Sequence, residues 1–207
     1  MIIYSKELYN YSSKVLSFFW KNNVRENKKL FKRKYDAILF GYNRTGFEIL
    51  TALTKLKKHY LVVDFNPDTI SALNKFRIPS LYGDAEDLEF LNELKLDKIE
   101  LAISTIPEYE TTFLLIESIR LVNPNAVIIV RAENINEALE FYEKGADYVL
   151  TPQFLGGEHI AKMIKSIKTN KKGYEKEKEK HLKRINEVLK KDKSNLKISS
   201  FNRKFHY

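Results

Sequence analysis

Short apolar runs alternate along this chain with longer segments in which apolar residues recur every three or four positions. Residues 37–40 and 60–63 are runs of the first kind, and residues 47–53 carry apolar side chains at helical spacing. Unbroken runs of four residues are typical of strands buried on both faces of a parallel sheet. The wider spacing predicts an amphipathic helix. This part of the chain therefore predicts a strand–helix–strand unit.

The same alternation continues to about residue 167. Further strands are predicted at 78–82, 101–103, 126–130 and 148–150. One predicted helix begins at Pro67, after an Asn66 cap, and a short second helix places Leu88, Leu91 and Leu94 on its inner face. Three further helices are predicted at 113–123, 135–145 and 156–167. Six strands alternating with helices predict an α/β fold of the Rossmann-like, doubly wound type. Its six-stranded parallel sheet should have the order 3-2-1-4-5-6, with an N-terminal amphipathic helix and a charged C-terminal tail outside it.

The turn after the first strand has the spacing of a phosphate-binding loop. It reads GYNRTG over residues 41–46. Gly41 allows a backbone conformation that other residues avoid, and the amides at the helix start point toward an anion. Gly46 allows the helix to pack closely on the strand. Asp64 follows Gly46 by 18 residues, where an acid accepts hydrogen bonds from a ribose diol and disfavours the 2′-phosphate of NADP.

One position departs from the G-x-G-x-x-G fingerprint. Asn43 stands where the middle glycine normally lets the backbone approach a pyrophosphate. Asn tolerates a left-handed backbone better than most residues, so the turn remains possible. Its side chain still occupies space that a dinucleotide would use. A Rossmann-like fold with a degenerate, empty site is therefore the alternative interpretation.

Polar or glycine residues also follow the other predicted strands. Gly83-Asp84-Ala85 follows the third strand, Ser104-Thr105 the fourth, and Arg131 the fifth. In such sheets ligands bind at the carboxyl ends of the strands, where the strand order reverses, here between strands 1 and 4. We therefore expect a ligand at this edge.

Three segments are predicted, at 1–34, 35–168 and 169–207. In the first, aromatic and aliphatic residues from Tyr4 to Trp20 recur at helical spacing before a polar, lysine-rich linker. This helix packs on its own domain or on a dimer partner, or it lies at a membrane interface with the lysines on the cytoplasmic side. The last segment predicts a solvated Lys/Glu-rich helix or short coiled coil, followed by disorder at 194–207.

Composition narrows the possible functions. The chain has no cysteine, which excludes disulfides, thiolate metal sites and cysteine nucleophiles. No segment resembles a secretory signal, and no window approaches the roughly 18 apolar residues of a membrane span. The net charge of +9 is concentrated in the two extensions. A lysine-rich proteome explains this charge as well as an anionic partner does, and no nucleic-acid-binding motif accompanies it.

Six motifs together resemble one family. GYNRTG, VVDFNP, YGDA, AISTIP, IIVRAEN and GADYVLTP lie within residues 35–165. They are similar to the TrkA-N, or RCK N-terminal, domain of potassium channels and Kef-type monovalent cation/proton antiporters. Residues 4–34 resemble the connection to the last transmembrane helix in such antiporters, and nothing resembles an RCK C-terminal lobe. The resemblance implies a homodimeric regulatory domain on the cytoplasmic side of the cell membrane, gating a potassium or sodium transporter in the same or a separate chain.

The resemblance also implies which residues bind a nucleotide. The glycine turn would hold phosphate with charge from Arg44, Asp64 would hold the adenine ribose, and the loop after the third strand would meet adenine. The loop after the fourth strand would line the phosphate or second-ribose side, and Arg131 would reach phosphate or the partner subunit. The full set is Gly41, Tyr42, Asn43, Arg44, Thr45, Gly46, Asp64, Phe65, Asp84, Ala85, Ser104, Thr105 and Arg131. The implied cofactor is NAD(H), AMP, ADP or ATP, and Asn43 counts against the full dinucleotide.

An NAD-dependent oxidoreductase with a minimal Rossmann domain is the alternative function. Such an enzyme needs a substrate lobe and an acid/base pair beside the nicotinamide. Only about 40 residues follow the last predicted core helix, and they are mostly Lys and Glu. His59 lies at the start of a strand, on the wrong edge of the sheet, and His159 is expected at the surface. We therefore predict no catalytic residue, no metal site and no nucleic-acid partner.

Overall fold

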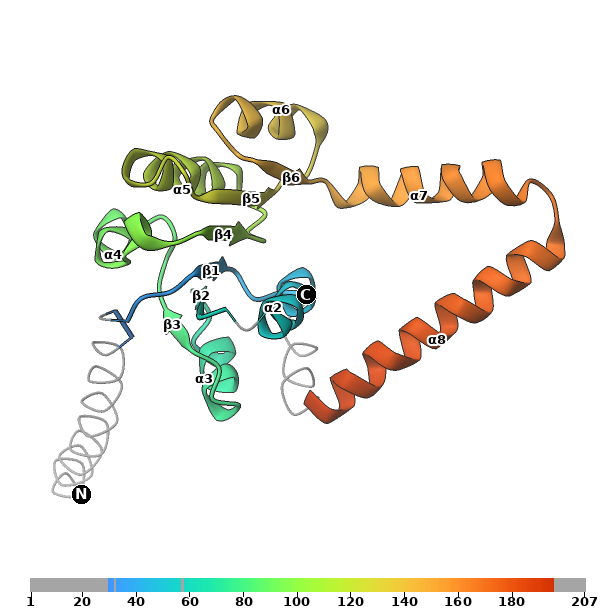
Figure 1. Cartoon of the computed structure of the whole chain (residues 1–207), viewed down its shortest axis with the longest axis horizontal. Coiled ribbons are helices and arrows are strands. Elements are labelled where there is room, and N and C mark those ends of the chain that lie inside the picture. The colour runs from blue at the N-terminus through green and yellow to red at the C-terminus, as the bar shows by residue number, and fades with distance from the viewer. Residues whose placement is uncertain (1–29, 32, 57, 196–207) are drawn as a thin grey trace, which may run out of the picture.

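The computed structural model describes residues 30–31, 33–56 and 58–195, with side chains as far as residue 186 (Figure 1). Within these residues six strands form one parallel sheet of order β3-β2-β1-β4-β5-β6. The strands are β1 (Ala37–Phe40), β2 (Tyr60–Asp64), β3 (Ser80–Tyr82), β4 (Leu101–Ser104), β5 (Val127–Arg131) and β6 (Tyr148–Leu150). The helices are α2 (Arg44–Lys55), α3 (Pro67–Lys75), α4 (Leu88–Glu93), the 3-10 turn η1 (Leu96–Lys98), α5 (Tyr109–Val122), α6 (Ile135–Glu143), α7 (Pro152–Ile167) and α8 (Lys171–Asn195). The predicted fold class and strand order are confirmed.

Local signals in the sequence set several helix ends. The Asn66 side chain caps α3 by accepting hydrogen bonds from the amides of Asp68, at 2.9 Å, and Thr69, at 3.4 Å. Gly145 follows α6 with a φ of +105°, a conformation that glycine adopts at little cost. Helix α7 begins at Pro152, before the predicted start at residue 156, because proline suits the first helical position.

Two apolar clusters lie on opposite faces of the sheet, since successive strand residues point to opposite sides. Helices α2 and α3 cover one face, where Leu53 and Leu73 pack on Leu39 and Val62. Helices α4, α5 and α6 cover the other face in a larger cluster that includes Ile116. The sheet is therefore buried on both faces at its centre, as the unbroken apolar runs predicted.

The short helix α4 differs in part from its prediction. Leu91 and Leu94 are buried as expected, but Leu88 is 53% exposed. Leu88 is the first residue of the helix, so it lies at the helix edge. Phe90 packs against the larger cluster instead. A three-residue spacing identified the helix correctly, but it could not identify which positions are buried in so short an element.

The last two helices leave the sheet. Figure 1 shows α7 extending away from β6 and α8 running back at an angle to it. Within the described chain no residue of α7 is buried, and Phe154, Ile160 and Ile164 are 49–57% exposed. Helix α8 runs to Asn195, so residues 194 and 195 are helical where disorder was predicted.

The structure does not describe the two ends of the chain, and it bears on the predicted lack of a membrane span only within the described residues. The amphipathic helix predicted at residues 4–20 and the tail at 196–207 lie outside the described residues. Among the residues that are described, no helix combines the length and the apolar character that crossing a bilayer requires.

Candidate functional site

The glycine turn joins β1 to α2 at the carboxyl edge of the sheet. Gly41 has a φ of +80°, and a Cβ there would lie 3.0 Å from Thr105 Oγ1 and 3.2 Å from Ile106 Cγ1. A Cβ on Gly46 would lie 2.8 Å from the carbonyl oxygen of Gly41. The turn thus requires glycine at position 41 for its backbone conformation, and at position 46 for the approach of the helix.

Asn43 plays a different part in the turn from the one the sequence indicated. Its φ is −106°, so it is extended and not left-handed, and it is the N-cap of α2. Its side-chain oxygen accepts a hydrogen bond from the Gly46 amide at 3.1 Å, and its side-chain nitrogen donates to the Thr105 carbonyl at 2.9 Å. Both polar groups of Asn43 therefore bond within the protein and join the turn to the end of β4.

Asp64 is a buried carboxylate at the end of β2, with 8% of its surface exposed. One oxygen accepts a hydrogen bond from the Tyr42 amide at 2.7 Å, and the other accepts from the Asn66 amide at 2.8 Å. Burial raises the pKa of Asp64 above its ordinary value, although these two amides oppose the shift. Each carboxylate oxygen can accept a further hydrogen bond, so a ribose hydroxyl can bind without displacing either amide.

The start of α2 offers donors to an anion. Arg44 and Thr45 occupy the first two helical positions, where backbone amides have no acceptor within the helix. The first turn of α2 contains no acidic residue, so no side chain of that turn neutralises the positive end of the helix dipole. The Arg44 side chain is exposed. Together these groups provide the hydrogen bonds and the charge that a phosphate needs.

Two exposed aromatic residues lie at the ends of β2 and β3. Phe65, which follows Asp64 directly, is 70% exposed, and Tyr82 is 57% exposed. Tyr82 pairs in register with Asp64, so both side chains point to the same face of the sheet. Tyr82 is the last residue of the predicted strand 78–82 and was not among the predicted site residues. Its position directly before Gly83, at the end of that strand, was the available signal.

In the loops after β3 and β4, most of the predicted site residues are buried or make hydrogen bonds within the protein. Asp84 is exposed, but Ala85 is 4% exposed and can offer a ligand little besides its backbone. The hydroxyl of Ser104 accepts a hydrogen bond from the Ile106 amide at 3.3 Å. Thr105 is fully buried and donates its hydroxyl hydrogen to the Gly41 carbonyl at 3.0 Å. Thr105 therefore supports the glycine turn, whereas the hydrogen bond of Ser104 lies within the loop that follows β4.

Arg131 lies at the end of β5, on the side of β4 away from β1. Its Nη2 is 2.5 Å from a carboxylate oxygen of Glu133, and its Nε is buried with no hydrogen-bond partner among the described residues. No hydrogen bond or ion pair joins it to the glycine turn in the described chain. The structure therefore brings the turn, Asp64 and the end of β4 together, and leaves Arg131 apart from them.

Comparison with a known domain family covers this whole region. The model of the TrkA-N domain matches residues 37–152, which is more than half of the chain. The matched range begins with β1 and ends after β6, so it includes every strand and every predicted site residue.

Two relatives are transport proteins by name. Probable potassium channel protein 2 of Methanocaldococcus jannaschii is 28% identical over 129 residues, which are 61% of this chain and 38% of that protein. Glutathione-regulated potassium-efflux system protein KefC of Escherichia coli is 28% identical over 128 residues, which are 60% of this chain and 20% of that protein. The chain thus spans less than two fifths of the length of either relative.

Two solved structures share the fold. The TrkA-N domain of the inner membrane protein ybaL from Escherichia coli has a TM-score of 0.61 at 22% identity, over 64% of this chain and 98% of that one. The Shewanella denitrificans Kef CTD in its AMP-bound form has a TM-score of 0.55 at 16% identity, over 82% of this chain and 99% of that one. At these identities the likeness shows the fold alone.

Proposed function

The chain belongs to the TrkA-N family, and we propose that it is a regulatory domain that binds an adenine nucleotide or NAD(H) and controls a potassium or sodium transport protein. Two relatives, a probable potassium channel protein and a potassium-efflux system protein, support the transport role. The domain would lie on the cytoplasmic side of the cell membrane and act on a transporter in the same or a separate chain. Residues 1–34 would connect it to that transporter.

The observation that carries this proposal is the arrangement of β1, the turn and α2 around Asp64. The turn keeps both glycines that its geometry requires, and it places a buried carboxylate beside the free amides of a helix N-terminus. A carboxylate suits a ribose diol, and helix amides suit a phosphate. These are adjacent parts of one nucleotide, which argues against a degenerate site.

The same geometry favours the adenosine monophosphate part of a ligand over a pyrophosphate and a second nucleoside. Asn43 replaces the glycine that admits a pyrophosphate closely, and the hydroxyls of Ser104 and Thr105 are bonded within the protein. The AMP-bound state of the Kef CTD supports an adenine nucleotide as the ligand class. We therefore expect AMP, ADP or ATP to bind at least as well as NAD(H).

Isothermal titration calorimetry with AMP, ADP, ATP, NAD⁺ and NADH tests the proposal directly. At least one of them should bind with a dissociation constant below 1 mM, and NADP should bind more weakly than NAD. Arg44→Gln should weaken binding and reduce its dependence on salt, since it removes a charge that faces phosphate. If none of the five binds below millimolar concentration, the site is degenerate and the proposal is wrong.

We propose binding without turnover, against the alternative of an oxidoreductase. His59 precedes β2, at the amino edge of the sheet, where its Nδ1 lies 3.3 Å from an Asp36 carboxylate oxygen. His159 is exposed on α7. His59 therefore lies at the edge opposite the glycine turn, and no hydrogen bond or ion pair among the described residues joins His159 to that turn. Continuous absorbance at 340 nm with NADH and a panel of carbonyl substrates should show no oxidation, and steady turnover would establish the enzymatic alternative.

We also propose a homodimer that is built on the Rossmann-like domain. The long helix α5 offers little of its apolar face to a partner, because Leu115, Ile116 and Ile119 are buried in the chain's own core. The apolar stripe of α7 is exposed instead, and so are Val127 and Tyr148 on β5 and β6. A second copy that covered these surfaces would remove a large apolar area from water.

A further inference from the structure

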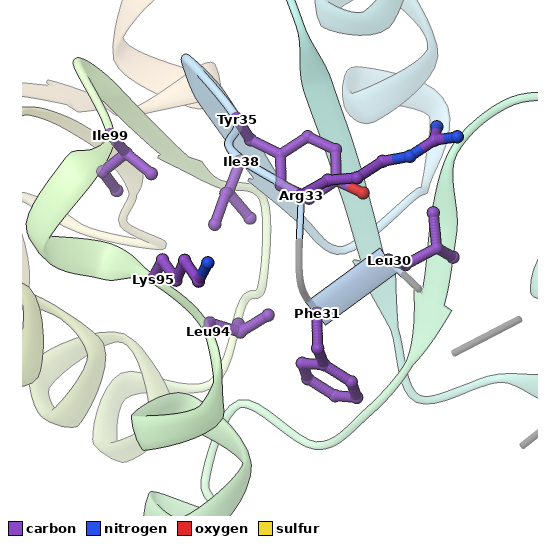
Figure 2. Close-up of a pocket in the computed structure, with 8 residues that line it drawn as sticks. All are labelled: Leu30, Phe31, Arg33, Tyr35, Ile38, Leu94, Lys95 and Ile99. Carbon is purple, nitrogen blue, oxygen red and sulfur yellow. The ribbon is translucent and has the colours of Figure 1, made fainter. Parts of the chain in front are cut away.

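The segment before β1 packs against the helix that follows the predicted adenine loop. Figure 2 shows Leu30, Phe31 and Arg33 on one side of a small pocket, and Leu94, Lys95 and Ile99 on the other. Its cavity volume is about 10 Å³, which is room for about one water molecule. The hydroxyl of Tyr35 is buried beside it without a hydrogen-bond partner among the described residues. This buried hydroxyl marks the contact as less completely hydrogen-bonded than the core around it.

Phe31 reaches from this segment to α4. Its ring meets the ring of Phe90 edge to face, with centroids 5.8 Å apart and an angle of 75° between the planes. Both residues pack against the larger apolar cluster. A shift of the Phe90 ring must therefore be followed by Phe31, or it must open a gap between the two rings.

The other side of Phe90 lies on Gly83. A Cβ built at Gly83 would fall 2.1 Å from the ring, which is closer than any real contact. Gly83 is the residue before Asp84, and its amide donates a hydrogen bond to the Asp64 carbonyl at 3.2 Å. The Phe90 ring thus rests on the bare backbone of the loop that is predicted to meet adenine.

Hydrogen bonds join this loop to α4 as one unit. The Asp84 carbonyl accepts from the Asp87 amide at 3.2 Å, and the Asp87 carboxylate accepts from the amide of Phe90, also at 3.2 Å. A displacement of Asp84 is therefore transmitted to the backbone of Phe90 as well as to its ring.

We propose that the loop Gly83–Asp84, the ring of Phe90 and the ring of Phe31 couple nucleotide occupancy to the segment that precedes β1. This inference rests on the proposed nucleotide site and describes how binding there would affect the rest of the chain. A nucleotide that engages Asp84 displaces the loop, Phe90 moves with it, and Phe31 moves the segment at residues 30–35. By thermodynamic reciprocity, a change in that segment alters nucleotide affinity by the same factor.

One arm of the test needs no ligand. Hydrogen exchange of the full chain, measured by mass spectrometry on peptides covering residues 28–38, should be several-fold faster in Gly83→Ala, because the new methyl group displaces Phe90. Gly83→Ala/Phe90→Leu should restore the slower exchange, since the smaller side chain makes room. Gly156→Ala is the matched control: nothing lies within 4 Å of a Cβ there, so exchange at 28–38 should not change. Equal exchange in Gly83→Ala and Gly156→Ala would overturn the proposal.

The second arm uses AMP and NADH as probes. A saturating probe should change exchange at residues 28–38 of the native chain by at least twofold. In Phe31→Ala this response should be lost, while calorimetry still detects binding with an altered dissociation constant. If a probe binds but residues 28–38 do not respond in the native chain, the coupling proposal is wrong and the nucleotide site stands. If neither probe binds while Gly83→Ala still speeds exchange at residues 28–38, the contact between Gly83 and Phe90 exists but does not respond to a nucleotide. Both the proposed nucleotide site and its proposed coupling to the segment before β1 are then wrong.

Discussion

Helices cover the two halves of the sheet to different degrees. The β1, β2 and β3 half is covered on both faces, and Leu39, Leu61 and Val62 have no measurable exposure. In the other half, β4 is still covered on both faces, with Ile103 only 5% exposed, whereas β5 and β6 are covered by α5 and α6 on one face only. On their other face Val127 is 45% exposed and Tyr148 is 48% exposed, among the described residues.

This difference in coverage suits the two halves of the sheet to different roles, ligand binding and association. The covered half carries the glycine turn and Asp64, whose hydrogen bonds are all made within one chain. A rigid site suits a ligand that must find its donors already in place. The open half carries apolar surface that one chain leaves in water, and such surface marks an interaction site. The covered half thus carries the proposed nucleotide site, whereas the open half offers the surface proposed for a second copy of the chain.

Truncating the core should break the covered half first, and this is the largest expected effect. Leu39→Ala should lower the free energy of unfolding by about 2–5 kcal/mol, because it leaves a cavity in a closed core. Ile129→Ala, on the same face but in the open half and partly buried, should cost about 1–2 kcal/mol. Urea denaturation followed by circular dichroism measures both values. Equal losses would show that β5 is as well covered in solution as β1.

A methyl group in the glycine turn should have the next largest effect. In Gly46→Ala the Cβ would lie 2.8 Å from a backbone oxygen, so α2 must move away from β1. We expect a loss of about 1–3 kcal/mol in stability and at least a tenfold loss in nucleotide affinity. Gly157→Ala is the control, since its Cβ meets nothing within 4 Å and alanine favours a helix. A Gly46→Ala chain that binds normally would show that close packing of α2 is not needed for the site.

Removing the charge of Asp64 should weaken nucleotide binding by about 1–3 kcal/mol, because charge-assisted hydrogen bonds to the ribose are lost. Asp64→Asn is a milder change than Asp64→Ala, since alanine would also strip two backbone amides of their acceptor. Calorimetry on both variants, with their urea midpoints, separates the loss of affinity from the loss of stability. Unchanged affinity in Asp64→Asn would remove this residue from the site.

The raised pKa of Asp64 predicts how the stability of the fold and the affinity for nucleotide each change with pH. Above its ordinary pKa of 3.8 and below the raised value, the folded chain holds a proton that the unfolded chain has released. The contribution of Asp64 to stability therefore falls as pH rises through this window. Nucleotide affinity should change in the opposite direction, decreasing as pH falls and the carboxylate is protonated. In Asp64→Asn both dependences should be reduced.

A charge on α7 should have the smallest effect on the single chain and a clear effect on its association. Ile160→Lys should change the free energy of unfolding of the monomer by less than about 0.5 kcal/mol, because the side chain is exposed. The same change should shift the chain toward monomer in light scattering at tens of micromolar. Ser166→Lys adds the same charge elsewhere on α7 and should leave association unchanged. A native chain that is monomeric at this concentration would contradict the dimer.

Much of the fold and part of the site could be predicted from neighbouring residues in the sequence. Gly41 acts through its own backbone, Gly46 through its approach to the Gly41 carbonyl five positions earlier, and Asn66 through amides within three positions, so their roles follow from local sequence. Asp64 was predictable because strand length fixes where β2 ends. Tyr82 was missed because its exposure depends on the packing of distant segments around the end of β3. The burial of Ala85 in the larger apolar cluster likewise depends on tertiary packing, and its predicted contact with adenine stays a prediction.

The sequence by itself determined the order of strands and helices, the parallel sheet and the position of the glycine turn, because apolar periodicity and backbone preference are short-range properties. Only the tertiary structure decided that Asn43 bonds to the end of β4, that Phe31 meets Phe90, and that β5 and β6 keep an uncovered face. These features join residues 59–62 positions apart, or depend on which helices cover which face. No local pattern encodes them, because they arise only when distant segments are packed together.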